Sequence, residues 1–163
     1  MPSRTSKKVR TRTEEVAHLL LVRGCVLTRD AVAALGLTRS QVEYVLRQLA
    51  SNGRAARIML GQLSVWCYSG NSAAKFINKL RRALHTALCR ANVKFVEPRK
   101  ALKIALSDEN ASKLFTRYVS LDAVSSSFIN SLLALTYGDP VYYKRTKPMY
   151  MVTCGEKLPP LRR

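Results

Sequence analysis

Residues that typically begin and end helices recur at short intervals over the first third of the chain. These start and stop signals constrain the fold more than any other feature of the sequence. Thr11 is followed three residues later by Glu14, which is the pattern of a capping box at a helix start. Glycine after the last residue of a helical pattern is typical of a helix end. The sequence predicts three short helices bounded by Thr11 and Gly24, by Thr28 and Gly36, and by Thr38 and Asn52-Gly53. Cys25-Val26-Leu27 is expected to be a short extended segment between the first two.

The third helix has one apolar face, and a hairpin is expected to follow it. Its apolar residues recur at helical spacing and are Val42, Val45, Leu46 and Leu49. Two β-type runs, Arg54–Leu60 and Leu63–Ser69, come next, joined by Gly61-Gln62. Glycine in the first central position suits a two-residue type II′ turn.

The order of these elements is helix, short strand, helix, tight turn, helix and hairpin. With the segment LTRDAVAALGLTRSQVEYVLRQLASNGRAARI, the chain resembles the winged helix-turn-helix superfamily, as in the MarR and ArsR groups of regulators. The resemblance covers about residues 11–70. It implies a small DNA-binding unit in which the second helix of the helix-turn-helix pair enters the major groove.

The second half repeats this plan with one added helix. Its expected elements are a helix from Asn71 to Ala91, a strand Val93–Val96, helices Arg99–Leu106 (with Pro98 in the first turn), about Glu109–Tyr118, and Asp122–Thr136, and a hairpin of Val141–Lys144 and Met149–Thr153 around Arg145–Pro148. Residues 23–26 match residues 90–93 loosely, and Cys67 matches Cys154. Two tandem units are therefore predicted, although two small α+β units could share this order by chance.

The fold class expected is thus α+β, mostly helical, with tandem winged helix-turn-helix units. The predicted organisation is a basic tail over 1–10, a first winged helix over 11–70, a second winged-helix-like unit with an inserted helix over 71–155, and a tail over 156–163.

The formal net charge of +18 on 163 residues indicates a polyanionic partner, chiefly nucleic acid. Residues 71–155 contribute half of that net charge, with fourteen basic and five acidic residues. The N-terminal tail adds cations without any acid, and those expected to contact nucleic acid are Lys7, Lys8 and Arg10.

Contacts to nucleic acid in the first unit are expected from the third helix and the hairpin. The side chains of the third helix that face away from its apolar side can hydrogen-bond to base edges or phosphates. With the role that the family resemblance implies, the residues predicted to contact DNA are Arg39, Ser40, Gln41, Tyr44 and Arg47, and Arg54 and Arg57 on the hairpin. A solvated polar face is the alternative. Glu43 would repel phosphate and is expected to face protein or a cytosine.

The corresponding helix of the second unit carries Ser126, Asn130 and Ala134 on its outward side, without arginine. It is expected to approach a backbone or pack on a partner rather than read sequence. Cations in this unit are expected on the long helix and at the hairpin tip: Lys75, Lys79, Arg82, Lys144, Arg145 and Lys147. Tyr142, Tyr143 and Tyr150 either support stacking on bases or pack across the strands.

Four cysteines lie far apart, without any C-x-x-C pair, and we expect them to be reduced and mostly buried in a cytoplasmic protein. No apolar run approaches the length of a membrane-spanning helix. The acids are not clustered as metal-dependent nucleases require, and no glycine-rich phosphate loop is present, so neither enzyme activity nor a metal or cofactor is expected.

These observations predict a non-enzymatic, nucleic-acid-binding protein, cytoplasmic and associated with the nucleoid. Duplex DNA is the favoured partner, and the protein is expected to act as a transcription regulator or chromatin-like factor. The sequence leaves open whether it forms a homodimer. One alternative is an RNA-binding structural component of a ribonucleoprotein, because both termini are basic. The other is a protein-docking module of the transcription machinery.

Overall fold

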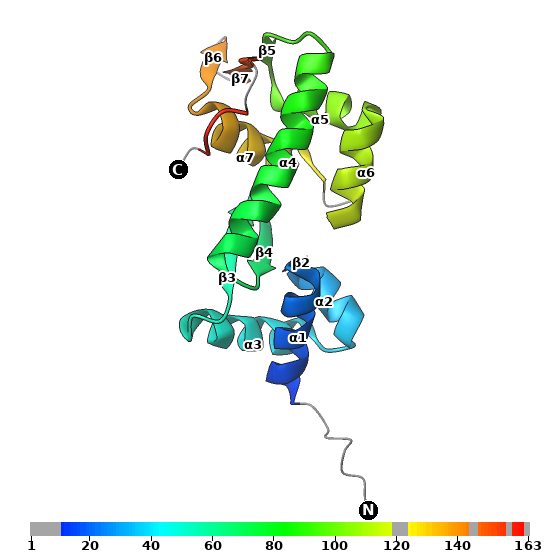
Figure 1. The fold of residues 1–163 in the computed structure, drawn as a ribbon, viewed down its shortest axis with the longest axis vertical. Coiled ribbons are helices and arrows are strands. Elements are labelled where there is room, and N and C mark those ends of the chain that lie inside the picture. Colours follow the sequence, from blue (N-terminus) through cyan, green and yellow to red (C-terminus); the bar gives the residue numbers. More distant parts are fainter. Residues whose placement is uncertain (1–10, 119–123, 144–146, 156–157, 162–163) are drawn as a thin grey trace, which may run out of the picture. The chain divides into compact units, whose positions relative to one another are not determined.

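The computed structural model describes residues 11–118, 124–143, 147–155 and 158–161. The protein is α+β and mostly helical, as predicted (Figure 1). It divides into two compact units, the first comprising Met1–Ile58 and Ser64–Ala73 and the second comprising Met59–Leu63 and Ala74–Arg163. The tip of one hairpin, Met59–Leu63, is therefore part of the second unit.

The first unit consists of three helices and a three-stranded sheet. Its elements in chain order are α1 (Arg12–Arg23), β2 (Cys25–Leu27), α2 (Thr28–Leu35), α3 (Arg39–Ser51), β3 (Ala56–Leu60) and β4 (Leu63–Cys67). The strand order is β2-β4-β3, with β2 antiparallel to β4. Gly61, with a φ of 66°, turns the chain between β3 and β4, where the sequence predicted a turn.

Local capping signals fix the ends of α1 and α3. Thr11 Oγ1 accepts a hydrogen bond from the Glu14 N–H at 3.2 Å. Thr38 and Gln41 form a reciprocal capping box: the Gln41 N–H donates to Thr38 Oγ1 at 3.1 Å, and the Thr38 N–H donates to Gln41 Oε1 at 3.0 Å. These bonds satisfy backbone donors that a helix start otherwise leaves unpaired.

The prediction that Thr28 caps α2 is wrong, because a tertiary contact takes its hydroxyl. Thr28 is the first residue of α2, and its Oγ1 accepts a hydrogen bond from Trp66 Nε1 at 2.9 Å. Leu27 occupies the cap position without a side-chain hydrogen bond. Both Thr28 and Trp66 are buried, so this bond pairs two polar groups that water cannot reach.

The apolar face predicted for the third helix lies in the core of the first unit. Val42, Val45, Leu46 and Leu49 of α3 are all buried, with exposures of 4% or less. They pack with residues of α1, α2, β2 and β4, namely Val16, Leu20, Val26, Ala31 and Trp66. The opposite face of α3 is thereby left toward solvent.

The second unit repeats the strand order of the first. Its elements are α4 (Gly70–Arg90, which begins in the first unit), β5 (Phe95–Val96), α5 (Pro98–Ser107), α6 (Glu109–Tyr118), α7 (Ser126–Tyr137), β6 (Val141–Tyr143) and β7 (Lys147–Met151). The sheet order β5-β7-β6 corresponds to β2-β4-β3, and both pairings are antiparallel. Between the first and last helices of this unit, α6 is the extra element, as the sequence indicated.

Two details of the second unit differ from the prediction. Ser125 caps α7, its hydroxyl accepting from the Phe128 N–H at 3.2 Å, whereas Asp122, where the sequence predicted this helix to begin, lies outside the described residues. Lys147 and Pro148 were expected in a turn but pair with Tyr143 and Tyr142 in the β6–β7 ladder. Proline is tolerated there because β5 extends only along Tyr150 and Met151, so Pro148 faces no strand on its other side.

The expectation of reduced cysteines is wrong, since two disulfides join Cys25 to Cys67 and Cys89 to Cys154. Cys25 and Cys67 are direct partners in the antiparallel β2–β4 pair, with Cα atoms 4.0 Å apart. Sequence separations of 42 and 65 residues carry no local signal, so only the pairing of distant segments reveals them. Each disulfide links the early part of its unit to a segment at or just after the last strand.

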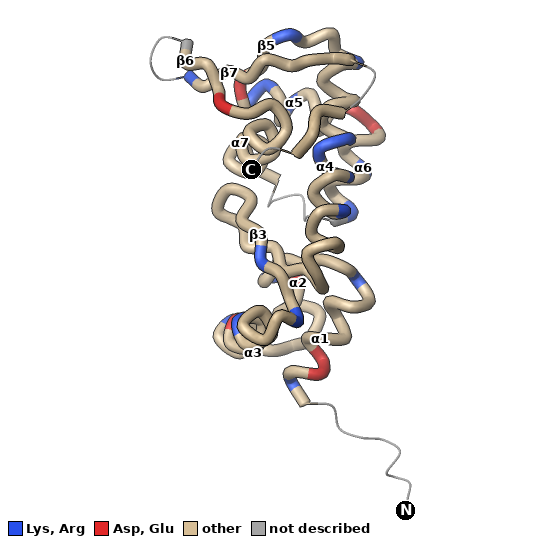
Figure 2. Tube along the Cα trace, turned by 60° about the vertical axis from the view of Figure 1, so that its left-hand side comes forward, with Lys and Arg blue, Asp and Glu red and all other residues tan. Residues whose placement is uncertain are grey.

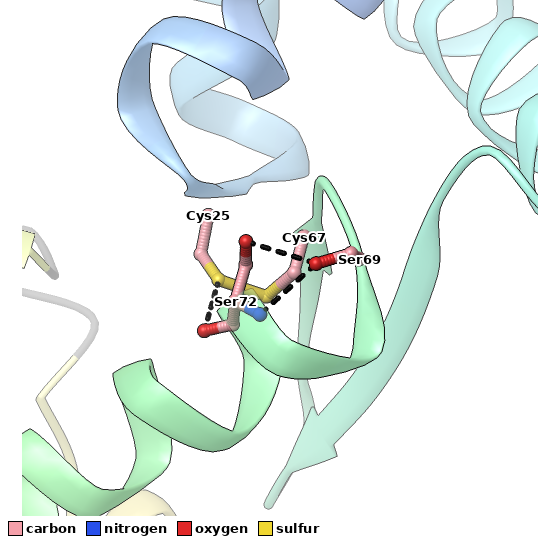
Figure 3. The surroundings of a disulfide bond; sticks show 4 residues. All are labelled: Cys25, Cys67, Ser69 and Ser72. Carbon is pink, nitrogen blue, oxygen red and sulfur yellow. Dashed lines mark hydrogen bonds between the residues drawn. A yellow bond between two sulfur atoms is a disulfide. The ribbon is translucent and has the colours of Figure 1, made fainter.

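The surroundings of the first disulfide lie where α4 begins (Figure 3). The Ser72 N–H donates to Ser69 Oγ at 3.1 Å, which caps the first turn of α4. Cys25 Sγ lies 3.6 Å from the carbonyl oxygen of Ser72. The disulfide thus fixes β2 and β4 to each other directly beside the start of the long helix. Within the described part of the chain, no helix is both long and apolar enough to cross a membrane.

Candidate nucleic-acid interface

The outward face of α3 gathers cations and hydrogen-bonding groups on a firmly anchored helix. Arg39, Ser40, Tyr44 and Arg47 are all exposed, and Tyr44 is 64% exposed. They lie opposite the four buried apolar residues, which hold the helix to the core. Arginine and serine at these positions can donate to phosphates or to base edges.

Glu43 lies between two of these arginines and is paired with both. Arg39 Nε donates to Glu43 Oε1 at 2.7 Å, and Arg47 Nη2 lies 3.9 Å from Glu43 Oε2. The hydrogen bond from Arg39, together with the charges of Arg39, Arg47 and Arg57, outweighs desolvation and lowers the pKa of Glu43. The carboxylate therefore stays ionised at neutral pH and competes with any incoming phosphate for Arg39.

Two other polar side chains of α3 have partners within the helix. Gln41 is half-buried, and its amide oxygen accepts from the Thr38 N–H as part of the cap. The Tyr44 hydroxyl accepts a hydrogen bond from Gln48 Nε2 at 2.8 Å. Gln41 thus contributes to the helix start, and the Tyr44–Gln48 pair forms a surface on the exposed side.

The hairpin holds Arg57 in a defined orientation next to this helix. Arg57 Nη2 donates to Ser64 Oγ at 2.8 Å, and the guanidinium carbon lies 5.1 Å from the centre of the Trp66 ring. An arginine over the face of an aromatic ring gains a cation–π attraction. Arg54 is exposed just before β3 begins. Both cations add to the positive surface of α3 within the first unit.

A second positive surface follows α4 in the second unit. Lys75, Lys79 and Arg82 are exposed and spaced four and three residues apart, so they share one side of the helix. Figure 2 shows the basic positions along α4. A cavity of about 320 Å³ between α4 and α6 is lined by Lys79, Arg82, Ala83, Thr86, Arg90, Asp108, Asn110, Ala111 and Leu114.

Arg90 extends this surface, and sequence analysis missed it. Arg90 Nη1 donates to Asp108 Oδ1 at 2.7 Å, and the other Asp108 oxygen accepts from the Ala111 N–H at 2.9 Å. The signal that could have found Arg90 is the continued spacing from Lys79 through Arg82 and Thr86 along α4. We call the surface formed by Lys75, Lys79, Arg82, Thr86 and Arg90 the α4 groove.

The helix α7, which corresponds to α3 in the order of elements, has its polar side occupied. The Asn130 side-chain oxygen accepts from the Tyr150 hydroxyl at 2.7 Å, and Ser131 Oγ accepts from the Gly61 N–H at 2.6 Å. A Cβ on Gly61 would lie 2.5 Å from Ser127 Oγ, so the hairpin tip lies directly against α7 within the second unit. Ser126 is half-buried.

Six predicted contact residues belong to the hairpin of the second unit and to the N-terminal tail. Lys147 is exposed at the start of β7. Tyr142 is 63% exposed, whereas Tyr150 is buried. The remaining ones lie outside the described residues, and they are Lys144, Arg145, Lys7, Lys8 and Arg10.

A buried polar cluster in the second unit serves packing between segments. Arg81 is 2% exposed and donates to Thr136 Oγ1 at 3.1 Å, to Asn78 Oδ1 at 2.7 Å and to the carbonyl oxygen of Pro159. Burial lowers the pKa of Arg81 and also that of His85, whose Nδ1 lies 2.6 Å from the Tyr137 hydroxyl. Among the described residues, no group of three or more His, Cys, Asp or Glu could hold a metal ion.

Part of the chain matches a protein-family model, and the fold is similar to that of a solved structure. Residues 73–151, which run from α4 to β7, match the family model described as PSV, transcriptional regulator domain. The chain is also similar to the crystal structure of hypothetical protein PyrSV_gp04 from Pyrobaculum spherical virus, with a TM-score of 0.73 and 25% sequence identity. That similarity covers 86% of this chain and 93% of the other. No curated protein sequence matches the chain.

Proposed function

We propose that this protein is a non-enzymatic transcription regulator that binds duplex DNA, built from two tandem winged helix-turn-helix units. The shared strand order, β2-β4-β3 and β5-β7-β6, supports the tandem arrangement. In each unit a helix, a short strand and further helices precede the hairpin, as the resemblance to winged helices implies. The match of residues 73–151 to a transcriptional regulator domain supports the regulatory role.

The exposed face of α3 is the observation that carries the proposal. A helix enters the major groove of DNA when one side is anchored in a core and the other offers donors to base edges. The buried Val42 and Leu46 anchor α3, and Arg39 and Arg47 offer guanidinium donors from its exposed side. Arginine can bind guanine through two hydrogen bonds, which discriminates between bases by about 1–3 kcal/mol.

The second unit is proposed to hold the phosphate backbone rather than read bases. The hairpin tip and Tyr150 occupy the polar side of α7, so this helix lacks the donors that α3 presents. The cations of the α4 groove offer charge that neutralises phosphates irrespective of sequence. In this division of labour, the first unit selects the site and the second adds affinity.

We propose a location with the DNA, in the cytoplasm and at the nucleoid, despite the two disulfides. Disulfides persist in oxidising compartments, but they are also abundant in intracellular proteins of hyperthermophiles. The formal charge of +18 suits a protein that works beside a polyanion. The oligomeric state proposed is a monomer or a homodimer, which analytical ultracentrifugation distinguishes.

The experiment is selection of a randomised duplex pool with the wild type and with Arg39→Ala combined with Arg47→Ala. The variant is expected to lose most sequence preference while keeping its circular dichroism spectrum, because both side chains point away from the core. Lys100→Ala with Lys103→Ala is the matched control: it removes two exposed cations from α5 and should leave the preference unchanged. Full selectivity in the Arg39 and Arg47 variant would overturn the proposal.

Sequencing of the nucleic acid that co-purifies at low salt addresses the alternative partners. Short duplex DNA fragments support the proposal. Ribosomal RNA would instead support the role of a structural ribonucleoprotein component, and the absence of nucleic acid at any salt concentration would favour a protein-docking module.

A further inference from the structure

The outward face of the β5-β7-β6 sheet is apolar and exposed. Side chains alternate across a strand, and Tyr150 of β7 points into the core, with 2% exposure. Met149 and Met151 therefore lie on the other face, where they are paired across the strands with Val141 and Phe95. Phe95, Met151 and Val141 are 52%, 56% and 62% exposed. We call Phe95, Val141, Met149 and Met151 the sheet platform.

Positive charge and a cavity border the sheet platform. Lys94, which precedes Phe95, and Lys147, at the far end of β7, are both exposed. A cavity of about 400 Å³ lies along the β5 side, lined by Lys94, Phe95 and Met151 together with the hydrogen-bonding side chains of Asn92 and Thr153. Its volume is within the range of small-molecule and base-sized sites. The platform supplies a flat aromatic ring and flexible methionines, and its borders supply cations and polar groups.

Charge decides between the occupants that an apolar face could accept. A second copy of this chain would bring its own Lys94 and Lys147 toward the same lysines, and like charges across an interface are unfavourable. Duplex DNA has its bases stacked on each other, so it offers phosphates but no open base faces. Unpaired nucleotides offer both, since each base has an apolar face and each phosphate a negative charge.

We propose that the second unit binds single-stranded nucleic acid on the sheet platform, with a base stacked on Phe95 and flanking phosphates near Lys94 and Lys147. Aromatic side chains on a sheet are a recurrent means of holding unpaired bases. On this face of the hairpin and its neighbouring strand, Phe95, Val141 and Met151 are each at least 52% exposed. The proposal does not depend on duplex binding by α3, because the two surfaces use different residues.

The test is fluorescence anisotropy of labelled twelve-nucleotide oligo(dT) and oligo(rU) with the full chain. Phe95→Ala should weaken binding of both by roughly 5- to 100-fold, in line with the loss of one base–aromatic stack. Phe95→Trp should keep the affinity within about threefold of the wild type, because it retains an aromatic face. Leu21→Ala is the matched control, since Leu21 of α1 is 57% exposed and lies in the other unit.

The remaining outcomes each decide the question. An unchanged affinity in Phe95→Ala, or an equal loss in Leu21→Ala, would overturn the proposal. So would a wild-type dimer that Phe95→Ala converts to a monomer in analytical ultracentrifugation, because a second copy would then cover the platform. The sequence preference for duplex DNA, measured in parallel, should be unaffected by Phe95→Ala and mostly lost in the Arg39 and Arg47 variant, which keeps failure of this inference distinct from failure of the duplex-binding proposal.

Discussion

The helices α3 and α7 hold the same place in the order of elements, but the polar side of α3 is exposed and that of α7 is covered. Helix α3 buries one apolar face and exposes Arg39, Tyr44 and Arg47 on the other. Helix α7 is packed on more than one side: Phe128 and Leu132 lie in the core, and Ser131 contacts the Gly61 backbone. The same topology therefore leaves the polar side of α3 exposed, whereas other segments cover the polar side of α7.

The two disulfides also differ between the units. Cys25 is 9% and Cys67 0% exposed, so the first disulfide is part of the core around β2 and β4. In the second unit, Cys89 is half-buried and Cys154 is exposed. Both cross-links restrict the unfolded chain to a similar degree, but only the second can be reached by a reductant without opening the fold.

The largest effect is expected from removing the disulfides. Closing loops of 42 and 65 residues stabilises by about 4 kcal/mol in each case on the chain-entropy model. Cys25→Ala with Cys67→Ala should lower the melting temperature more than Cys89→Ala with Cys154→Ala, because it also removes two buried sulfurs from the core. Thermal unfolding followed by circular dichroism measures both.

Mild reductant sharpens the same comparison. Alkylation followed by mass spectrometry should detect reduced Cys89 and Cys154 before reduced Cys25 and Cys67 as reductant is added. If the buried pair is reduced first, or if the Cys89 and Cys154 variant melts at the lower temperature, the assignment of the stronger structural role to the first disulfide is wrong.

A smaller effect is expected from the α4 groove. Neutralisation of about 6 to 8 phosphates gives a slope of roughly −5 to −7 for log affinity against log salt. Lys79→Ala with Arg82→Ala should make this slope shallower by about 2 and lower duplex affinity roughly tenfold across all sequences, since phosphate contacts carry no sequence information. A change in sequence preference instead would show that the groove reads bases, contrary to the proposed division between the units.

The capping of α1 and α3 could be predicted from sequence because the signals are local. Thr38 and Gln41 are three residues apart, and the capping box needs nothing beyond them. The apolar face of α3 follows from helical spacing alone. Among the candidate contacts, the same spacing located the exposed Arg39, Tyr44 and Arg47.

What escaped prediction depends on segments far apart in the chain. Thr28 has the sequence position of a helix cap, but its hydroxyl accepts a hydrogen bond from Trp66, 38 residues away. The disulfides join residues that only strand pairing brings together. Asn130 has the spacing of an outward residue, yet the Tyr150 hydroxyl is its partner. Sequence patterns find which side of a helix is polar, but only the tertiary structure reveals whether another segment covers that side.

Asn130 and Gln48 offer a matched test of buried against exposed polar pairs. Each bonds a tyrosine hydroxyl, Asn130 with the buried Tyr150 and Gln48 with the exposed Tyr44. Asn130→Ala should lower the free energy of unfolding by about 1–2 kcal/mol because it leaves a hydroxyl unpaired away from water, and sequence preference should not change. Gln48→Ala should cost less than about 0.5 kcal/mol. Urea denaturation measures both, and equal losses would show that α7 is as open to water as α3.

The smallest effect expected is a gain of affinity in Glu43→Gln. Arg39 and Arg47 both pair with Glu43, and the lowered pKa of Glu43 keeps the competing carboxylate ionised at neutral pH. Glutamine retains the shape but removes the charge, so duplex affinity should rise roughly three- to fivefold at low salt, with less gain at high salt because exposed charges are screened. The pairing stabilises the fold above the unfolded pKa of Glu43, and this contribution is lost as pH falls through the lowered folded pKa. Once Glu43 is protonated it no longer carries the competing charge, so the duplex affinities of wild type and variant should converge in acid. Glu109→Gln removes the same charge from an exposed pair with Lys113 on α6 and should change affinity by less than about twofold. If both variants gain equally, the effect is one of net charge, and α3 holds no privileged contact with DNA.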